Sequence, residues 1–194
     1  MAVMLLRNRP AGIDSYPAGI TKGFKHLDAG WIDVLGWLQA NRVEHILVGA
    51  AARALRGERG ATGPVAIVPA PYGRNLDRVA RALCSAHARL RVDDRSGAGP
   101  AATASPPLKL TAESLLRGER WTLSCGTHEL DLEGRSPGAP RYQELLYEAS
   151  RFEPASELLV EVASPEDIEH YEHLRRTGVA PEIVVSRRTQ VQQS

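Results

Sequence analysis

Asp131 has the clearest arrangement for chemistry in this sequence. It lies in the segment Glu129-Leu130-Asp131-Leu132, whose alternation of charged and apolar residues predicts a β-strand. Because successive side chains on a strand point to opposite faces, Glu129 and Asp131 should share one face. Two carboxylates on one face offer the oxygen ligands that a hard cation such as Mg²⁺ requires. Asp131 is therefore a candidate catalytic residue, and Glu129 with Asp131 is a candidate metal site.

A group of arginines suggests a second kind of site, for an anion. Arg53, Arg56 and Arg59 follow the turn at Gly49-Ala50 at intervals of three, and Thr62 comes shortly after them. Guanidinium groups bind phosphate through donors in a fixed geometry, and backbone amides at the start of a helix also attract anions. Helical spacing places Arg53 near Arg56, so one anion could contact both. The alternative is that these arginines form a solvated helix face.

Two further groups have spacing that permits chemistry. His170 and His173 lie three residues apart, with acidic neighbours, in a segment that predicts a helix, and such a group can bind zinc. Cys125 would be a nucleophile if His128 approached it. A hydrophilic surface helix accounts for the histidines, and packing within a strand accounts for the cysteine, without either function.

Periodicity and turn residues predict the elements that must position these side chains. Helices are expected at 31–40, 51–55, 76–87, 142–151 and 165–176, and strands at 43–48, 64–69, 90–92, 121–125, 129–132 and 158–162. Pro64 and Pro69 favour an edge strand or a first strand position, and Asn75 suits a helix N-cap. The order indicates an α+β fold, a twisted mixed sheet with helices packed mainly on one face.

The same pass along the chain divides it into three parts. We expect an irregular N-terminal arm at 1–29, a domain at 30–177 and a C-terminal tail at 178–194. Residues 93–107 are rich in Gly, Ala, Ser and Pro, which predicts a loop. The first ten residues lack a long apolar core, so we expect no secretory signal there.

Several short motifs, taken in order, resemble the small bacterial nucleotidyltransferase-like proteins of the polymerase-beta superfamily. The resemblance spans about residues 31–176, and it implies a nucleotidyltransferase-like core. In that family a strand ends in Val-Gly-Gly, and a later strand opens with Arg-x-Thr-x-Asp-x-Asp. The pieces that carry the resemblance here are Val48-Gly49, Gly57, Thr62, Asn75-Leu76, Ala82-Leu83, Ala88, Leu130-Asp131-Leu132, Tyr142 and the run from Val162 to Asp167.

The resemblance also implies that the metal site is degenerate. Nucleotidyl transfer in this superfamily uses carboxylates on neighbouring strands to hold two Mg²⁺ ions. Pro64 and Ala66 stand where the first two aspartates would be, whereas Asp131 stands at the third position. Ala50 replaces the second glycine of the turn, and Glu172 replaces a lysine expected in the last helix. One remaining carboxylate rarely organises two divalent ions.

Composition limits the partners. The chain has 194 residues, 43% of them apolar, and a formal net charge of +1, so no overall field favours nucleic acid. Its uncharged apolar runs are far shorter than the roughly 20 residues of a membrane span. Cys84 and Cys125 have neither metal-type spacing nor a disulfide framework, which favours reduced thiols in the cytoplasm.

Three hypotheses about function follow. The first is a binding or regulatory protein that has lost metal-dependent transfer, with a nucleotide, another phosphate anion or a protein as its ligand. Its apolar partner site would involve Trp31, Trp37 and Tyr147, and a homodimer would cover exposed apolar surface. The second is an active, atypical nucleotidyltransferase that uses Mg²⁺ and an NTP, with Asp131 as a metal ligand and Glu58 or Glu129 as the nearest further carboxylate in sequence. The third is an antitoxin-like partner of a toxin enzyme.

Overall fold

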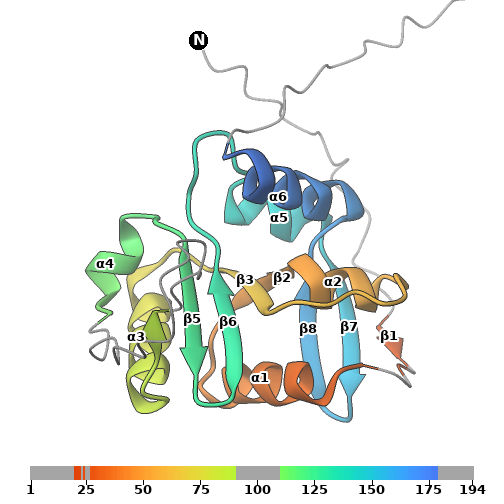
Figure 1. Cartoon of the computed structure of the whole chain (residues 1–194), viewed down its shortest axis with the longest axis horizontal. Coiled ribbons are helices and arrows are strands. Elements are labelled where there is room, and N and C mark those ends of the chain that lie inside the picture. The colour runs from red at the N-terminus through yellow and green to blue at the C-terminus, as the bar shows by residue number, and fades with distance from the viewer. Residues whose placement is uncertain (1–19, 23, 25–26, 91–109, 179–194) are drawn as a thin grey trace, which may run out of the picture.

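The computed structural model describes residues 20–22, 24, 27–90 and 110–178 (Figure 1). These residues form an α+β fold with one mixed sheet of eight strands and six helices. The strands are β1 (Thr21–Lys22), β2 (His45–Val48), β3 (Val65–Pro69), β4 (Arg89–Leu90), β5 (Trp121–Cys125), β6 (His128–Leu132), β7 (Ser150–Ala155) and β8 (Leu158–Val162). The helices are α1 (Ala29–Ala40), α2 (Gly49–Leu55), α3 (Gly73–Ser85), α4 (Ala112–Leu116), α5 (Tyr142–Glu148) and α6 (Pro165–Thr177).

The sheet order brings distant parts of the sequence together at its centre. The strands lie in the order β1-β7-β8-β2-β3-β6-β5-β4. β2 pairs in parallel with β8 and antiparallel with β3, and β3 pairs in parallel with β6. The register of β3 and β6 sets Ala66 directly opposite Asp131. These two residues are therefore neighbours on one face of the sheet, although 64 residues separate them in sequence.

The central strands are apolar because both of their faces are covered. Val48, Val65 and Ile67 are fully buried, and β2 and β3 each consist almost wholly of such residues, which is typical of interior strands. Three strands on one side of β2 and four on the other complete the sheet. Asp131, on β6, thus lies next to the hydrophobic core.

Local sequence signals fix α6, which will carry a site residue. Ser164 Oγ accepts a hydrogen bond from the backbone N–H of Asp167 at 3.2 Å, and Pro165 occupies the first helical position. Gly178 ends the helix in the left-handed conformation, with φ of 70°. The predicted start at Pro165 is confirmed. In Figure 1, α6 and α1 lie near opposite ends of the sheet.

Two expectations about β3 and α3 are corrected. β3 is an interior strand between β2 and β6, not an edge strand. Pro64 precedes the strand and Pro69 is its last residue, so neither removes an interior ladder donor. Asn75 is not an N-cap, because α3 begins at Gly73. Its buried amide instead joins two loops, accepting from the N–H of Glu44 and donating to the carbonyls of Glu44 and Ala70.

The expected helix at 142–151 is too long. α5 ends at Glu148, and β7 begins at Ser150, an additional strand that pairs with both β8 and β1. Apolar alternation in β7 is short and interrupted by Pro154, so periodicity did not distinguish it from the preceding helix. Within the expected irregular arm, Thr21–Lys22 forms the edge strand β1.

Several expectations fall outside the described residues. These are most of the arm, the end of the expected strand at 90–92, the loop at 93–107 and the tail from 179 onward. Among the described residues, no helix combines the length and apolar character needed to span a membrane.

Candidate functional site

Two buried carboxylates lie at the carboxyl end of β6. Asp131 is 1% exposed and Glu133 is 9% exposed. The N–H of Glu133 donates to the carbonyl of Ile67 at 2.9 Å, which extends the pairing with β3 beyond the end of the strand. Since Asp131 and Glu133 are two residues apart in extended chain, they share the face opposite to that of Leu132. A buried carboxylate is costly unless it has charged or hydrogen-bonding partners.

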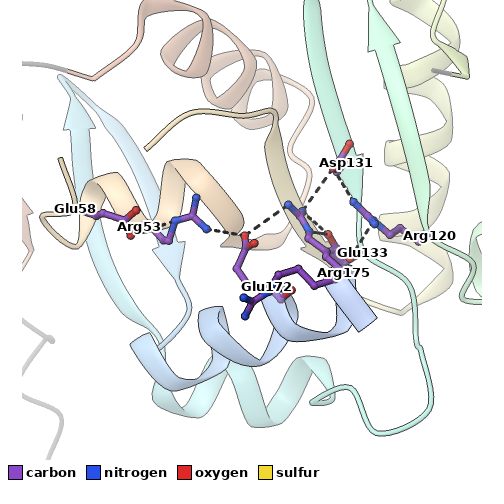
Figure 2. A network of polar contacts seen from close by, with 8 residues as sticks. Arg53, Glu58, Arg120, Asp131, Glu133, Glu172 and Arg175 are labelled. Carbon is purple, nitrogen blue, oxygen red and sulfur yellow. Dashed lines mark hydrogen bonds and ion pairs between the residues drawn. The ribbon is translucent and has the colours of Figure 1, made fainter. Parts of the chain in front are cut away.

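Two arginines supply these partners (Figure 2). Arg120 lies just before β5 and places Nη2 at 3.2 Å from Asp131 Oδ2 and Nε at 3.6 Å from Glu133 Oε2. Arg175, on α6, donates from Nε to Glu133 Oε1 at 2.7 Å, and its Nη2 contacts the same oxygen. Arg175 Nη2 is also 3.6 Å from Asp131 Oδ2. Each guanidinium therefore faces both carboxylates.

Small residues make the space for the guanidinium of Arg175. Gly49 has φ of 69°, and a Cβ added there would lie 3.0 Å from Ala66 Cβ and 3.3 Å from Arg175 Nη1. The positive φ and the close approach both favour glycine at this position. The lack of a Cβ at Gly49 thus leaves room for both the Arg175 guanidinium and the methyl group of Ala66. Gly49 and Ala66 belong to the turn and the strand at which the resemblance implies a metal site.

The ion pairs continue from this centre toward α2. Glu172 Oε1 lies 3.8 Å from Arg175 Nη1 and 2.9 Å from Arg53 Nη1. Arg53 Nε is 3.2 Å from Glu58 Oε2 but makes no hydrogen bond, so that contact is Coulombic only. Along the chain Glu58–Arg53–Glu172–Arg175–Glu133–Arg120–Asp131, three guanidinium groups face four carboxylates, which leaves one formal negative charge.

The structure separates the residues expected to bind an anion. Arg53 points to Glu58 and Glu172, whereas Arg56 donates to the carbonyls of Ala163 and Val162 at 2.7 and 3.1 Å. Burial lowers the pKa of Arg56. Arg56 also lies over the Phe152 ring, 5.5 Å from its centroid. Arg56 therefore joins α2 to the end of β8.

The other members of that expected set differ in exposure. Arg59 and Thr62 are exposed, whereas Gly49 and Ala50 are buried at the start of α2. Arg53 and Arg56 are close in sequence on α2, but their donors point to different partners.

Glu129 and Asp131, the expected metal pair, differ in their surroundings. Glu129 shares its strand with Asp131 but is exposed near the turn between β5 and β6, while Glu133 lies beside the same arginines as Asp131. Among the described residues, no group of three or more His, Cys, Asp or Glu side chains is arranged to hold a metal ion. This includes the surroundings of His170 and His173.

Cys125 lies opposite His128 in the β5–β6 ladder. Burial raises the pKa of the Cys125 thiol to about 11, so the thiolate needed by a nucleophile is scarce near neutral pH. His128 Nε2 is 3.9 Å from Asp33 Oδ2, on α1. Cys125 packs against the hydrophobic core, and the raised pKa of its thiol disfavours nucleophilic catalysis.

The aromatic residues expected at a partner site do not form a shared exposed patch. Trp31 and Trp37 are partly buried against the core, and Trp31 Nε1 donates to the carbonyl of Gly63 at 2.9 Å. Tyr147 is 49% exposed.

The sequence analysis did not identify three residues of this site, Glu133, Arg120 and Arg175. Glu133 could have been predicted, because a residue two positions after Asp131 on an extended chain lies on the same face. Arg120 directly precedes Trp121, which pairs with Leu132, so extending the hairpin register by one residue brings it opposite Glu133. Arg175 offers no such local signal, because its partners lie 42 and 44 residues away.

The fold and site define an α+β protein with a buried carboxylate pair neutralised by two arginines from separate elements. Comparison of the chain with protein-family models and with curated proteins found no match.

Proposed function

We propose that this protein has a nucleotidyltransferase-like core that has lost metal-dependent nucleotidyl transfer and serves as a binding or regulatory protein. The observation that carries the proposal is the pairing of Asp131 and Glu133 with Arg120 and Arg175. The site thus contains its own positive charges where the superfamily resembled by the sequence would place Mg²⁺.

The residues present do not fit a pair of Mg²⁺ ions. Ala66, opposite Asp131, has no oxygen in its side chain, and Pro64 has none either. Mg²⁺ requires a near-octahedral shell of oxygens at about 2.0–2.1 Å. A cation would have to displace the Arg175 guanidinium from Asp131 and Glu133, and breaking such buried pairs is costly.

The charge of the site also disfavours a nucleoside triphosphate. The linked ion pairs carry one formal negative charge, so they provide no surplus positive charge for three phosphate groups. In a low-dielectric setting, repulsion between like charges is strong. This argument favours a scaffold role over an active transferase that uses Asp131.

Calorimetric titration of ATP, GTP, CTP and UTP, each with and without Mg²⁺, tests the proposal. The wild-type chain and Asp131→Asn are compared, because asparagine keeps the size of the side chain and removes its charge. We expect no Mg²⁺-dependent binding in either protein. A parallel incubation with labelled ATP and Mg²⁺ should transfer no label to the protein or to added RNA.

Mg²⁺-dependent binding that disappears in Asp131→Asn would overturn the proposal and support an active transferase. Circular dichroism of both proteins must first show the same folded spectrum, so that loss of binding is not confused with unfolding.

A further inference from the structure

A groove lined by both charged and apolar groups lies away from the carboxylate site, between the end of α1, the start of β2 and the start of β8. It has a volume of about 370 Å³, and its lining includes Arg42, Glu44, His45, Arg78 and Leu159. Burial lowers the pKa of His45, so its imidazole is neutral at pH 7. The formal charges of the lining therefore come from two guanidiniums and one carboxylate, a surplus of one positive charge.

Arg42 supplies this surplus charge. Arg78 Nη1 is 3.1 Å from Glu44 Oε1, and it also donates to the backbone carbonyl of Arg42 at 3.1 Å. The Arg42 side chain is exposed, and its guanidinium has no ion pair or hydrogen bond within the described residues. It is therefore free to bind a ligand in the groove.

The backbone of Arg42 has a conformation that suits glycine. Arg42 follows the C-cap of α1 with φ of 55°, and the N–H groups of Arg42 and Val43 bond to the carbonyls of Gln39 and Leu38. Glycine is the usual residue at this left-handed position. An arginine costs conformational energy relative to glycine there, so the backbone should accept the substitution Arg42→Gly.

We propose that this groove binds a small organic anion bearing a carboxylate or phosphate group. The Arg42 and Arg78 guanidiniums bind the anionic group, and the carbon part of the ligand packs on Leu159, which is 45% exposed. Guanidinium recognises both kinds of oxyanion through paired donors. The ligand's charge complements the surplus positive charge of the groove.

Amide-resolved NMR titrations of the full chain provide the test. The probes are benzoate and phenyl phosphate, with acetate and inorganic phosphate as counterparts that lack the apolar part, all at constant ionic strength. We expect saturable shifts at the amides around residues 39–45, with stronger binding of the two aromatic probes. The preferred anionic group distinguishes a carboxylate ligand from a phosphate ligand.

Arg42→Gly and His87→Gly form a matched pair of variants. His87 follows α3 with φ of 48°, and the N–H groups of His87 and Ala88 bond to the carbonyls of Cys84 and Leu83, which repeats the cap at Arg42 outside the groove. Both glycines suit their backbones, so both variants should fold. Arg42→Gly should weaken binding about tenfold or more, as expected for loss of a charged hydrogen bond, and His87→Gly should bind like the wild type.

Absence of saturable binding in the wild type would overturn the proposal. Equal binding by wild type and Arg42→Gly would do so too, because the probe would then not depend on the free guanidinium.

Discussion

Arg175 acts at the scale of a single residue as the counter-ion of a buried site. Its side chain is 15% exposed and faces Glu133, which is 5% exposed at the side chain. Arg175→Ala should lower the free energy of unfolding by about 3 kcal/mol, because it leaves buried carboxylates with one guanidinium instead of two. Urea denaturation measures this change.

Arg176→Ala is the matched control. Arg176 is exposed on the same turn of α6, and its Nε donates to the backbone carbonyl of Glu172 at 3.4 Å. We expect its replacement to change stability by less than about 0.5 kcal/mol, as is usual for a surface residue. Similar losses in the two variants would contradict a special role for Arg175.

The sequence predicted one of the four residues of this site. The pattern around Asp131 placed it on a strand, and the structure confirms that strand at His128–Leu132. The arginine partners were not found, because periodicity tells which face a side chain occupies but not which distant element covers that face. Asp131 meets Arg175 only after β3, β6 and α6 have packed together.

At the scale of elements, Arg56 is the main polar link between α2 and β8. Its donors contact the carbonyls of Val162, the last residue of β8, and Ala163, and both residues are fully buried. Arg56→Ala should reduce the free energy of unfolding by about 2 kcal/mol, since two carbonyls lose a charged donor. Thermal or urea unfolding followed by circular dichroism gives the value.

Arg59→Ala serves as the control for Arg56→Ala. Arg59 is exposed after α2 and forms no ion pair or hydrogen bond within the described residues. Its replacement should be nearly neutral. If Arg59→Ala proved as costly as Arg56→Ala, the backbone contacts of Arg56 would not explain its effect.

The elements were predictable where a local signal was strong. Ser164-Pro165 predicted the start of α6, and alternation predicted β5 and β6. The end of α5 and the start of β7 were missed because adjoining residues can satisfy both periods over so short a span. The interior place of β3 depends on its pairing with β6, a long-range contact that its flanking prolines do not reveal.

At the scale of the whole molecule, the packing of α6 onto the sheet determines whether the carboxylates can meet a metal ion. Arg175 reaches them from α6, while Ala66 occupies the neighbouring position on β3. We expect the wild-type unfolding temperature to be unchanged by Mg²⁺ at constant ionic strength. A ligand that binds the native state would instead raise its stability.

Unlike the wild type, the combined variant Ala66→Asp with Arg175→Ala should be stabilised by Mg²⁺. It removes one guanidinium and sets a third carboxylate opposite Asp131 and near Glu133, which gives a hard cation an oxygen-rich site. At a Mg²⁺ concentration roughly 100 times its Kd, stability should rise by about 2.7 kcal/mol. Differential scanning calorimetry with Mg²⁺ or EDTA measures the shift.

The two single variants show which substitution causes the Mg²⁺ response of the combined variant. Ala66→Asp alone retains Arg175, which should pair with the new carboxylate and keep the response to Mg²⁺ small. Arg175→Ala alone leaves two buried carboxylates beside Arg120, too few oxygens for a tight site. A wild-type protein stabilised by Mg²⁺ as strongly as the combined variant would mean that Arg175 does not compete with the metal. The assembled fold would then hold a cation site that includes residues beyond Asp131 and Glu133.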